Sequence, residues 1–510
     1  MGRIVTKEEF KTKIRPALKA ESQTIALCHG VFDLVHPGHM IHFEQAGKMA
    51  DVLVVSITAA KYVRKGPGRP YFSDEMRLKF LSAIEYIDYV LLSEGYTVDD
   101  MVEVVEPDIY VKGSEYADEG ADITGKIREE RELVERHGGR IQYTGGQVYS
   151  STKLINTAMS GLSEEVRRYM EEFNSRHSME EVLKYAQDAE KLKVLVVGDV
   201  IVDRYTYCAV QGLMSKDMGY SARLKTTEEY FGGAAAVARH LAGFSEDVTL
   251  MSIIGNEEEM RLKLFDEVSE QVQLKLTYSS KFPTIVKHRY LTRNAKREEY
   301  KKIFAITNIP EKMCFDEESA QKFKERLREK IESYDVVFLC DFGNGLVDSE
   351  IMDIVQKGTK YLILNCQTNS SNYGRNIITK YTRADAFSLD QTELKLAYPA
   401  MVDDENGALR ALCESMGGRG WLTRGSLGAY GVEAGEIASC PAFTLTVKDT
   451  VGAGDAFLSV AGIFSAAGAP VEVGTFLGNI GGALGANIIG NKEAVDKVNV
   501  LKYASTLMNV

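Results

Sequence analysis

Several features that would place a protein in a special class are missing from this sequence. Its 510 residues contain seven scattered cysteines and no C-x-x-C pair, which argues against both a disulfide framework and a zinc site. No apolar run approaches the roughly 20 residues that a membrane-spanning helix needs. The charged first residues also differ from the apolar core of a signal peptide. We therefore expect a globular, cytoplasmic protein that does not cross a membrane.

The sequence also has fewer basic than acidic residues. Lysine and arginine number 61 against 73 aspartate and glutamate residues, which gives a formal net charge of -12. A nucleic-acid-binding surface usually needs clustered basic residues that displace counterions from phosphates. We therefore expect small-molecule partners and no nucleic acid.

The length and the hydrophobic pattern predict two α/β domains. Single hydrophobic cores stop growing at roughly 250 to 300 residues, so this chain needs at least two. Short β-branched runs alternate with helical periods from residue 24 onward, and again from the run KVLVVGDVIVD at residue 193. The charged stretch between them indicates a helical connector, in which Ser178 has the spacing of a helix cap. The predicted divisions are a first domain at 1–156, a connector at 157–192 and a second, larger α/β domain at 193–510.

The segment His36-Pro37-Gly38-His39 follows a predicted strand and begins a predicted helix. Amide N–H groups and the positive end of the helix dipole attract phosphate at such a position, and Gly38 permits a ligand to approach closely. Two histidines three residues apart lie on one helix face, which suits stabilisation of charge during attack on the α-phosphate of a nucleoside triphosphate. Taken alone, the pair is equally compatible with a metal site that includes His42, or with ordinary helix packing.

The residues around this pair resemble the signature of the cytidylyltransferase-like nucleotidyltransferases. The string from Gly30 to His39 matches G-x-F-D-x-x-H-x-G-H, and the resemblance extends over residues 24 to 156. It implies a Rossmann-like fold in which His36 and His39 are catalytic. It also implies nucleotide contacts from Val31, Phe32, Lys65, Arg77, Lys112, Ser150, Ser151 and Thr152. From the residues alone, Lys65 and Arg77 could be surface charges, and the hydroxyls at 150–152 could cap a helix.

A second phosphate-binding motif lies at Asp449–Phe457, with the sequence D-T-V-G-A-G-D-A-F. Small residues at a helix start leave amide N–H groups open to a γ-phosphate, and Asp455 can take a proton from an attacking hydroxyl. The P-loop pattern G-x-x-x-x-G-K-[ST] does not occur, so phosphoryl transfer would use this other motif. The segment resembles the signature of the PfkB/ribokinase carbohydrate kinases, and the resemblance covers residues 193 to 508.

The kinase resemblance implies a role for each of its motifs. Asp455 is the expected catalytic base, with ATP as the phosphoryl donor and Mg²⁺ bridging phosphate oxygens. The expected anion hole is Gly452, Ala453 and Gly454; the expected nucleotide contacts are Asp390, Glu393, Thr423 and Gly425; and the expected sugar contacts are Asp203, Gly232 and Gly233. Judged by its position alone, Asp203 could instead cap a turn at a strand end.

Together the two halves resemble the bifunctional heptose-phosphate kinase/adenylyltransferases, with the order of the domains reversed. The kinase half departs from the family pattern at Ala236, His240, Asn365–Gln367 and Asp390, and we expect these changes to alter groups that face the substrate.

We therefore expect bifunctional sugar activation. One domain would phosphorylate a sugar or sugar phosphate with ATP, and the other would transfer a nucleotidyl group from ATP or CTP to a sugar phosphate, releasing pyrophosphate. The alternative is a nucleotidyltransferase, including one for a polyol or amino-alcohol phosphate, whose kinase-like half only binds ligand or dimerises. A homodimer is expected because related kinases pair through their lids.

Overall fold

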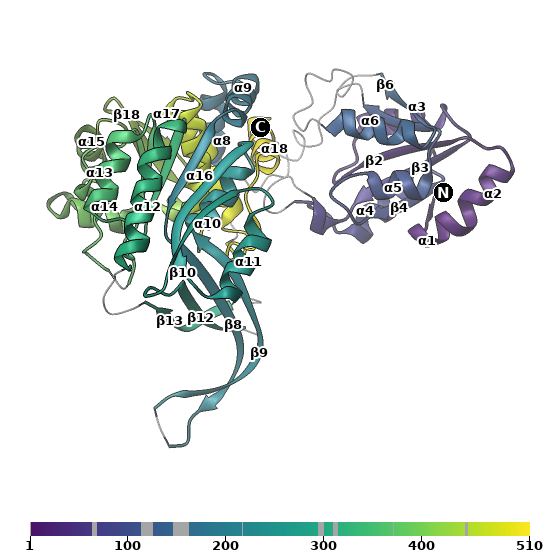
Figure 1. Ribbon diagram of the computed structural model, residues 1–510. Coiled ribbons are helices and arrows are strands. Elements are labelled where there is room, and N and C mark those ends of the chain that lie inside the picture. The colour runs from purple at the N-terminus through teal and green to yellow at the C-terminus, as the bar shows by residue number, and fades with distance from the viewer. Residues whose placement is uncertain are drawn as a thin grey trace. The chain divides into compact units, whose positions relative to one another are not determined.

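The computed structural model describes residues 2–63, 69–113, 126–145, 163–216, 218–293, 300–309, 315–370, 372–443 and 447–509. The chain divides into two compact units, Met1–Glu171 with Leu501–Val510, and Glu172–Val500. Each unit contains a parallel or mostly parallel β-sheet with helices packed on it, which confirms the predicted two-domain α/β fold class (Figure 1). Within the described ranges, no helix is both long enough and apolar enough to cross a membrane.

The first unit contains a six-stranded sheet of the described residues, and all its pairings are parallel. The strand order is β1-β4-β3-β2-β5-β6. From β2 the chain proceeds outward through β3 and β4, then returns to the other side of β2 with β5. The carboxyl end of β2 therefore lies at a topological switch point, where open α/β sheets bind their ligands. The strands are β1 (Arg3–Ile4), β2 (Ile25–Gly30), β3 (Val52–Thr58), β4 (Tyr89–Ser93), β5 (Ile109–Gly113) and β6 (Arg140–Thr144).

Both faces of this sheet are covered, because successive side chains of its strands enter opposite cores. On β2, Leu27 packs in one hydrophobic cluster with Phe10, while Cys28 packs in the other with Phe43 and Leu81. Such burial on both faces explains the near-continuous apolar runs of a parallel sheet. The helices of this unit are α1 (Lys7–Glu9), η1 (Phe10–Ile14), α2 (Arg15–Ala20), α3 (Pro37–Gly47), η2 (Ala60–Tyr62), α4 (Asp74–Ser82), α5 (Asp99–Val105) and α6 (Lys126–Arg136).

Two helices occupy the described part of the predicted connector. The division between the units falls within α8 (Glu164–Asn174). The second helix is α9 (Met179–Glu190), and the Ser178 hydroxyl accepts a hydrogen bond from the Glu181 N–H at 3.2 Å. The capping residue predicted from the sequence is thus confirmed.

The second unit is built on a nine-stranded sheet in the order β11-β10-β7-β14-β15-β16-β17-β18-β19. Its pairings are parallel from β11 to β17 and antiparallel beyond. The carboxyl ends of β7, β14, β15 and β16 therefore meet along one edge. The strands are β7 (Lys193–Gly198), β10 (Asp247–Gly255), β11 (Gln273–Ser279), β14 (Val336–Asp341), β15 (Leu362–Cys366), β16 (Ala386–Asp390), β17 (Arg419–Thr423), β18 (Ala429–Glu433) and β19 (Glu436–Cys440).

Helices cover both faces of the large sheet. Helix α16 is apolar around most of its circumference and is buried along nearly its whole length, as expected of a helix in the interior of a large domain. The helices are α10 (Ala234–Ala242), α11 (Glu258–Val268), α12 (Glu317–Lys330), η5 (Ile331–Ser333), α13 (Ser349–Gly358), η6 (Ile378–Lys380), α14 (Gln391–Ala397), η7 (Pro399–Met401), α15 (Glu405–Met416), η8 (Gly425–Leu427), α16 (Ala453–Ala466) and α17 (Val471–Gly485). The last helix, α18 (Lys497–Met508), contains residues of both units.

A separate four-stranded sheet belongs to the second unit. Its order is β13-β12-β8-β9, with β8 (Val200–Leu213), β9 (Tyr220–Gly233), β12 (Ile285–Arg293) and β13 (Tyr300–Asn308). Strand β8 follows β7 almost directly, so the base of this small sheet lies at the carboxyl edge of the large one. The β8–β9 hairpin extends far from the body of the unit (Figure 1).

Candidate active sites

A cleft of about 290 Å³ in the second unit is lined by residues of both its sheets. Lys287 and Arg289 of β12 line it together with Asp203 of β8. Strands β8 and β12 run parallel with Asp203 opposite Lys287, and residues two apart on a strand point to the same side. The register of the small sheet thus brings two cations and one carboxylate into the cleft.

Asp455 lies in the first turn of α16 and lines the same cleft. Its side chain is only 7% exposed, and its Oδ1 accepts hydrogen bonds from Asn365 Nδ2 (3.1 Å) and Gln367 Nε2 (2.8 Å). Burial raises the pKa of Asp455 to about 6, against the lowering effects of the Asn365 hydrogen bond and the Lys287 charge. A carboxylate with this pKa is mostly ionised at neutral pH, yet is a stronger base than an ordinary aspartate.

The backbone before Asp455 takes a conformation that only glycine adopts easily. Gly452 caps α16 with φ 82°, and a Cβ there would lie 2.0 Å from Asn491 Oδ1. A Cβ added at Gly454 would meet nothing within 4 Å. Both glycines line the cleft, so the N-terminal turn of α16 faces the space where a phosphate would bind. Ala453, the other expected anion-hole residue, is outside that lining, and its N–H donates to the Thr450 carbonyl at 3.3 Å.

At the end of the cleft formed by the small sheet, Asp203 is ion-paired with Arg289 and is 4% exposed. Gly232 and Gly233 allow β9 to pass close by. A Cβ at Gly232 would lie 2.2 Å from Asp203 Oδ2, and one at Gly233 would lie 2.4 Å from the Asp199 carbonyl. Gly233 lines the cleft, whereas Gly232 packs behind Asp203.

The other end of the cleft is formed by adjacent strands of the large sheet. Asp390 and Thr423 are partners in the pairing of β16 with β17, and both line the cleft with Glu393. Asp390 and Glu393 form a capping box at the start of α14, and Glu393 Oε1 also accepts from the Thr368 N–H at 2.9 Å. Burial, more than the nearby Asp390 charge, raises the pKa of Glu393 to about 7. Gly425, with φ 57°, lies in η8 outside the cleft lining.

In the first unit, the two motif histidines form a compact pair at the start of α3. His36 is the N-cap residue, and its Nδ1 accepts from the Gly38 N–H at 3.1 Å. The His36 N–H in turn donates to His39 Nδ1 at 3.3 Å, and the two rings stack with centroids 3.9 Å apart. Phe32 packs edge-on against His39. The predicted helix start is confirmed, and the reciprocal cap holds both imidazoles beside the helix N-terminus.

Arg77 is completely buried beneath the loop that carries Val31. Its guanidinium donates to the carbonyls of Val31 (2.7 Å) and Thr58 (2.9 Å) and is ion-paired with Asp74 (2.6 Å). The structure therefore gives Arg77 a role in fixing the Val31 backbone, and its expected contact with a triphosphate stays a prediction.

His42 of α3 and Lys112 of β5 both contact Thr144, the last residue of β6. His42 Nδ1 lies 2.8 Å from Thr144 Oγ1, whose hydroxyl donates to the Lys112 carbonyl at 3.3 Å. Burial, aided by the Lys112 charge, lowers the pKa of His42 to about 4. Lys112 is ion-paired with Glu130 at 2.7 Å. Lys65, Ser150, Ser151 and Thr152 lie outside the described residues.

Comparison with known families shows which family the second unit matches. Residues 191–484 match the pfkB family of carbohydrate kinases, a stretch longer than half the chain. The chain belongs to the pfkB family. Residues 27–157 separately match the cytidylyltransferase-like family. Both predicted resemblances are confirmed at the level of the family.

Individual relatives cover only part of the pfkB chain. The bifunctional protein HldE of Syntrophotalea carbinolica is 33% identical over 142 residues, 27% of this chain and 28% of its own length. The HldE of Pelobacter propionicus is 36% identical over 152 residues, 29% of each chain. The chain thus spans less than a third of the length of these relatives. A crystal structure of phosphofructokinase-2 from Escherichia coli in complex with potassium aligns with a TM-score of 0.49 and 16% identity, covering 62% of this chain and 99% of that one.

Two positions where the sequence departs from the pfkB pattern do not face the cleft as expected. Ala236 and His240 both lie on α10 and are buried. His240 Nδ1 accepts from the Val495 N–H at 2.9 Å, and burial lowers its pKa to about 3. Neither belongs to the cleft lining among the described residues, so these differences change core packing. Asp390, by contrast, lines the cleft, where its role as an N-cap suits aspartate as well as asparagine.

Sequence reasoning missed several cleft residues of this pfkB unit. Lys287 and Arg289 were not identified, although the pattern I-V-K-H-R-Y of β12 places cations at alternate positions. Asn365 and Gln367 were noted only as departures from the family pattern, and their contact with Asp455 spans about ninety residues of sequence. Asn491 also lines the cleft, and no motif in the neighbouring sequence indicates that position.

Proposed function

We propose that the chain activates a sugar in two steps. The pfkB unit phosphorylates a sugar or sugar phosphate with ATP, and the cytidylyltransferase-like unit transfers a nucleotidyl group from ATP or CTP to the sugar phosphate. The observation that carries this proposal is the placement of Asp455, a buried base with a pKa of about 6, in the cleft beside Gly452 and Gly454 at the start of α16. The relatives are named bifunctional proteins, which also supports two activities in one chain.

In the kinase step, Asp455 takes the proton of a substrate hydroxyl. As the O–H bond breaks, the hydroxyl oxygen forms a bond to the γ-phosphorus of ATP. The bond from that phosphorus to the bridging oxygen breaks, and ADP leaves with the electron pair. Amide groups of Gly452 and Gly454, which line the cleft at the start of α16, stabilise charge on the transferred phosphoryl group.

The cleft also fits a magnesium ion bound with ATP. Within the described ranges, no three His, Cys, Asp or Glu side chains gather to hold a metal by themselves. Asp390 and Glu393 nevertheless present carboxylate oxygens, the ligand type that Mg²⁺ prefers, and Mg²⁺ commonly keeps its waters and binds substrate phosphates. We infer that these two residues bind the hydrated ion, which would neutralise the phosphate charge.

Two cations, Lys287 and Arg289, line the end of the cleft formed by the small sheet, where a phosphate on the sugar substrate would bind. Arg289 is paired with Asp203, while Lys287, whose pKa is lowered chiefly by burial, adds a second cation. The charges of Asp203, Asp455 and Asp199 act on Lys287 against the effect of burial. A phosphate on the sugar would add a further anion beside Lys287.

In the transferase step, a phosphate oxygen of the sugar phosphate attacks the α-phosphorus of the nucleoside triphosphate. The bond to the β-phosphate oxygen breaks and pyrophosphate leaves, so no proton transfer is required. His36 and His39 at the N-terminus of α3 would stabilise charge on the α-phosphate, and the product is a nucleotide-sugar.

Phosphorus NMR of the intact protein with ATP or CTP, Mg²⁺ and a panel of sugars and sugar phosphates tests both activities together. Asp455→Asn should lower ADP formation at least about a hundredfold while leaving pyrophosphate release from a supplied sugar phosphate intact. His39→Ala should do the reverse. Unchanged sugar-dependent ADP formation in Asp455→Asn would refute the assignment of the base, and absence of ADP formation in the unmodified protein would favour a kinase-like unit that only binds ligand.

We also propose a homodimer that pairs through the small sheet. Its long hairpin exposes apolar side chains near the tip, including Leu213, Tyr220 and Leu224. Exposed apolar patches of this kind often mark protein–protein contacts. Light scattering of the protein and of Leu213→Asp should show a dimer that the substitution weakens.

A further inference from the structure

Two amide side chains from one stretch of chain hold the carboxylate of Asp455. Asn365 is the fourth residue of β15, and Gln367 follows the end of that strand. Residues two apart in extended chain point to the same side. Asn365 Nδ2 and Gln367 Nε2 accordingly reach the same atom, Asp455 Oδ1, at 3.1 and 2.8 Å.

The two hydrogen bonds distinguish the oxygens of Asp455. Two N–H donors occupy the lone pairs of Oδ1, so a proton arriving there would have to displace one of them. Oδ2 receives neither bond and is therefore the oxygen able to accept a proton. Because both donors favour the ionised form, they also oppose the effect of burial on this group.

The backbone of Gln367 is fixed on both sides. Its N–H donates to the Asp341 carbonyl at 2.9 Å, and its carbonyl accepts from Asn376 Nδ2 at 3.0 Å. Thr368 extends the connection, since its hydroxyl donates to the Asn376 carbonyl at 2.8 Å. The segment that carries the Gln367 amide is thus held by β14 and by the loop before η6.

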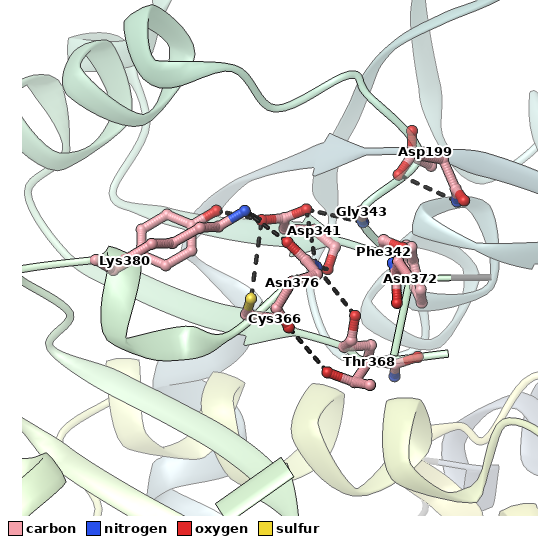
Figure 2. A network of polar contacts seen from close by, with 12 residues as sticks. Asp199, Asp341, Phe342, Gly343, Cys366, Thr368, Asn372, Asn376 and Lys380 are labelled. Atoms are coloured by element: carbon pink, nitrogen blue, oxygen red, sulfur yellow. Dashed lines mark hydrogen bonds and ion pairs between the residues drawn. The ribbon is translucent and has the colours of Figure 1, made fainter. Parts of the chain in front are cut away.

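An ion pair between Lys380 and the buried Asp341 supports Asn376 in turn. Figure 2 shows the Lys380 amino group reaching both Asp341 and Asn376. Lys380 Nζ lies 2.5 Å from Asp341 and donates to Asn376 Oδ1 at 2.6 Å, while the Tyr381 hydroxyl donates to Asp341 at 2.7 Å. Asp341 is only 2% exposed and Asn376 is also buried, so the hydrogen bonds between them are shielded from water, while the Lys380 side chain reaches the surface.

We propose that Asn365 and Gln367 are positioning residues that bind Asp455 Oδ1 and leave Oδ2 as the atom that takes the substrate proton. The Asp341–Lys380–Asn376 network holds Gln367 in place for this role. The inference rests on the proposed function of Asp455 as the kinase base.

Other charged and titratable groups also act on Asp455. Lys287 on β12 favours the ionised carboxylate and Asp203 on β8 opposes it. Cys340 on β14 and Glu393 on α14 are close enough to be influenced by the Asp455 charge. None of these groups is altered when an amide donor is removed, so a change in the titration of Asp455 would report on the amides themselves.

The test is the pH dependence of kcat/KM for ADP formation in Asn365→Leu and Gln367→Met. Each substitution removes one donor to a carboxylate and should move the acid limb up by about one pH unit, with a larger shift in the double variant. Gln356→Met is the matched control. Gln356 lies on α13, outside the cleft, and its side chain accepts hydrogen bonds from the N–H groups of Thr382 (2.8 Å) and Arg383 (3.0 Å). Gln356→Met should lower the free energy of unfolding without moving the acid limb of the pH profile.

A second measurement applies if the variants are too slow to assay. The carboxyl ¹³C signal of Asp455, assigned by its loss in Asp455→Asn, can be titrated in the full chain without turnover. A higher pKa of Asp455 in both variants than in the wild type supports the proposal. The wild-type pKa in both variants overturns it. Failure of the underlying function looks different, because Asp455→Asn would then still form ADP.

Discussion

At the scale of single residues, burial shifts the pKa of several side chains far from the ordinary value of their residue type. Burial raises the pKa of Asp199 to about 7 and that of Asp455 to about 6, while it lowers the pKa of His29 and His240 to about 3. In each case the neutral form is favoured because a buried charge loses its hydration. The same effect that makes Asp455 a better base therefore makes it costly to keep ionised.

Asp455→Asn should stabilise the protein at neutral pH. The folded-state pKa of Asp455 is raised above its unfolded value of 3.8, so the folded protein binds the extra proton, and stability is lost as the pH rises from about 4 through about 6. Asparagine has no charge to bury and keeps an acceptor oxygen for the amides of Asn365 and Gln367. Urea unfolding at pH 8 should show a gain over the wild type that disappears near pH 4; an equal effect at both pH values would contradict this explanation.

At the scale of elements, side-chain caps place functional groups as well as stabilising helices. His36 caps α3 and Asp390 caps α14, and each cap residue belongs to a candidate site. A cap orients the first helical turn, because its side chain accepts a hydrogen bond from an amide of that turn. Local sequence signals thus mark positions of catalytic interest.

Asp390→Ala should lower the free energy of unfolding by about 1 kcal/mol and raise the KM for Mg-ATP. The substitution removes the bond from the Glu393 N–H (2.8 Å) and so loosens a carboxylate that lines the cleft. Asp404→Ala is the matched control, since Asp404 caps α15 through the Gly407 N–H at 2.8 Å and is exposed. Asp404→Ala should lower the free energy of unfolding by a similar amount and leave the KM for Mg-ATP unchanged. Equal changes of KM in both variants would show that the effect is not specific to the cleft.

At the scale of the whole molecule, the two units have separate hydrophobic cores. Leu91 of β4 belongs to a core of the first unit and Leu339 of β14 to a core of the second, and both are fully buried. A core substitution should therefore act on one unit and on the activity that this unit carries.

Leu91→Ala and Leu339→Ala form a matched pair for this expectation. Each should cost about 2 to 5 kcal/mol of stability in its own unit. Calorimetry should show Leu91→Ala lowering the transition that coincides with loss of pyrophosphate release, and Leu339→Ala lowering the one that coincides with loss of ADP formation. A single transition lowered equally by both would mean that the units unfold together.

Short-range patterns in the sequence were sufficient for the fold class and the start of each site. The small residues before Asp455, the histidine pair of α3 and the Ser178 cap are all signals within a few residues, and each predicted helix start is found in the structure. Such signals work because hydrogen bonds at a helix start join residues two to four apart.

The partners that set the chemistry came only from the tertiary structure. Asp455 meets Asn365 from 90 residues away, and Asp203 meets Arg289 from 86. Periodicity reports which face of an element is buried, but strand order and register decide which elements meet. The parallel pairings of β8 with β12, of β14 with β15 and of β15 with β16 bring these side chains together, and the resulting burial raises the pKa of Asp455.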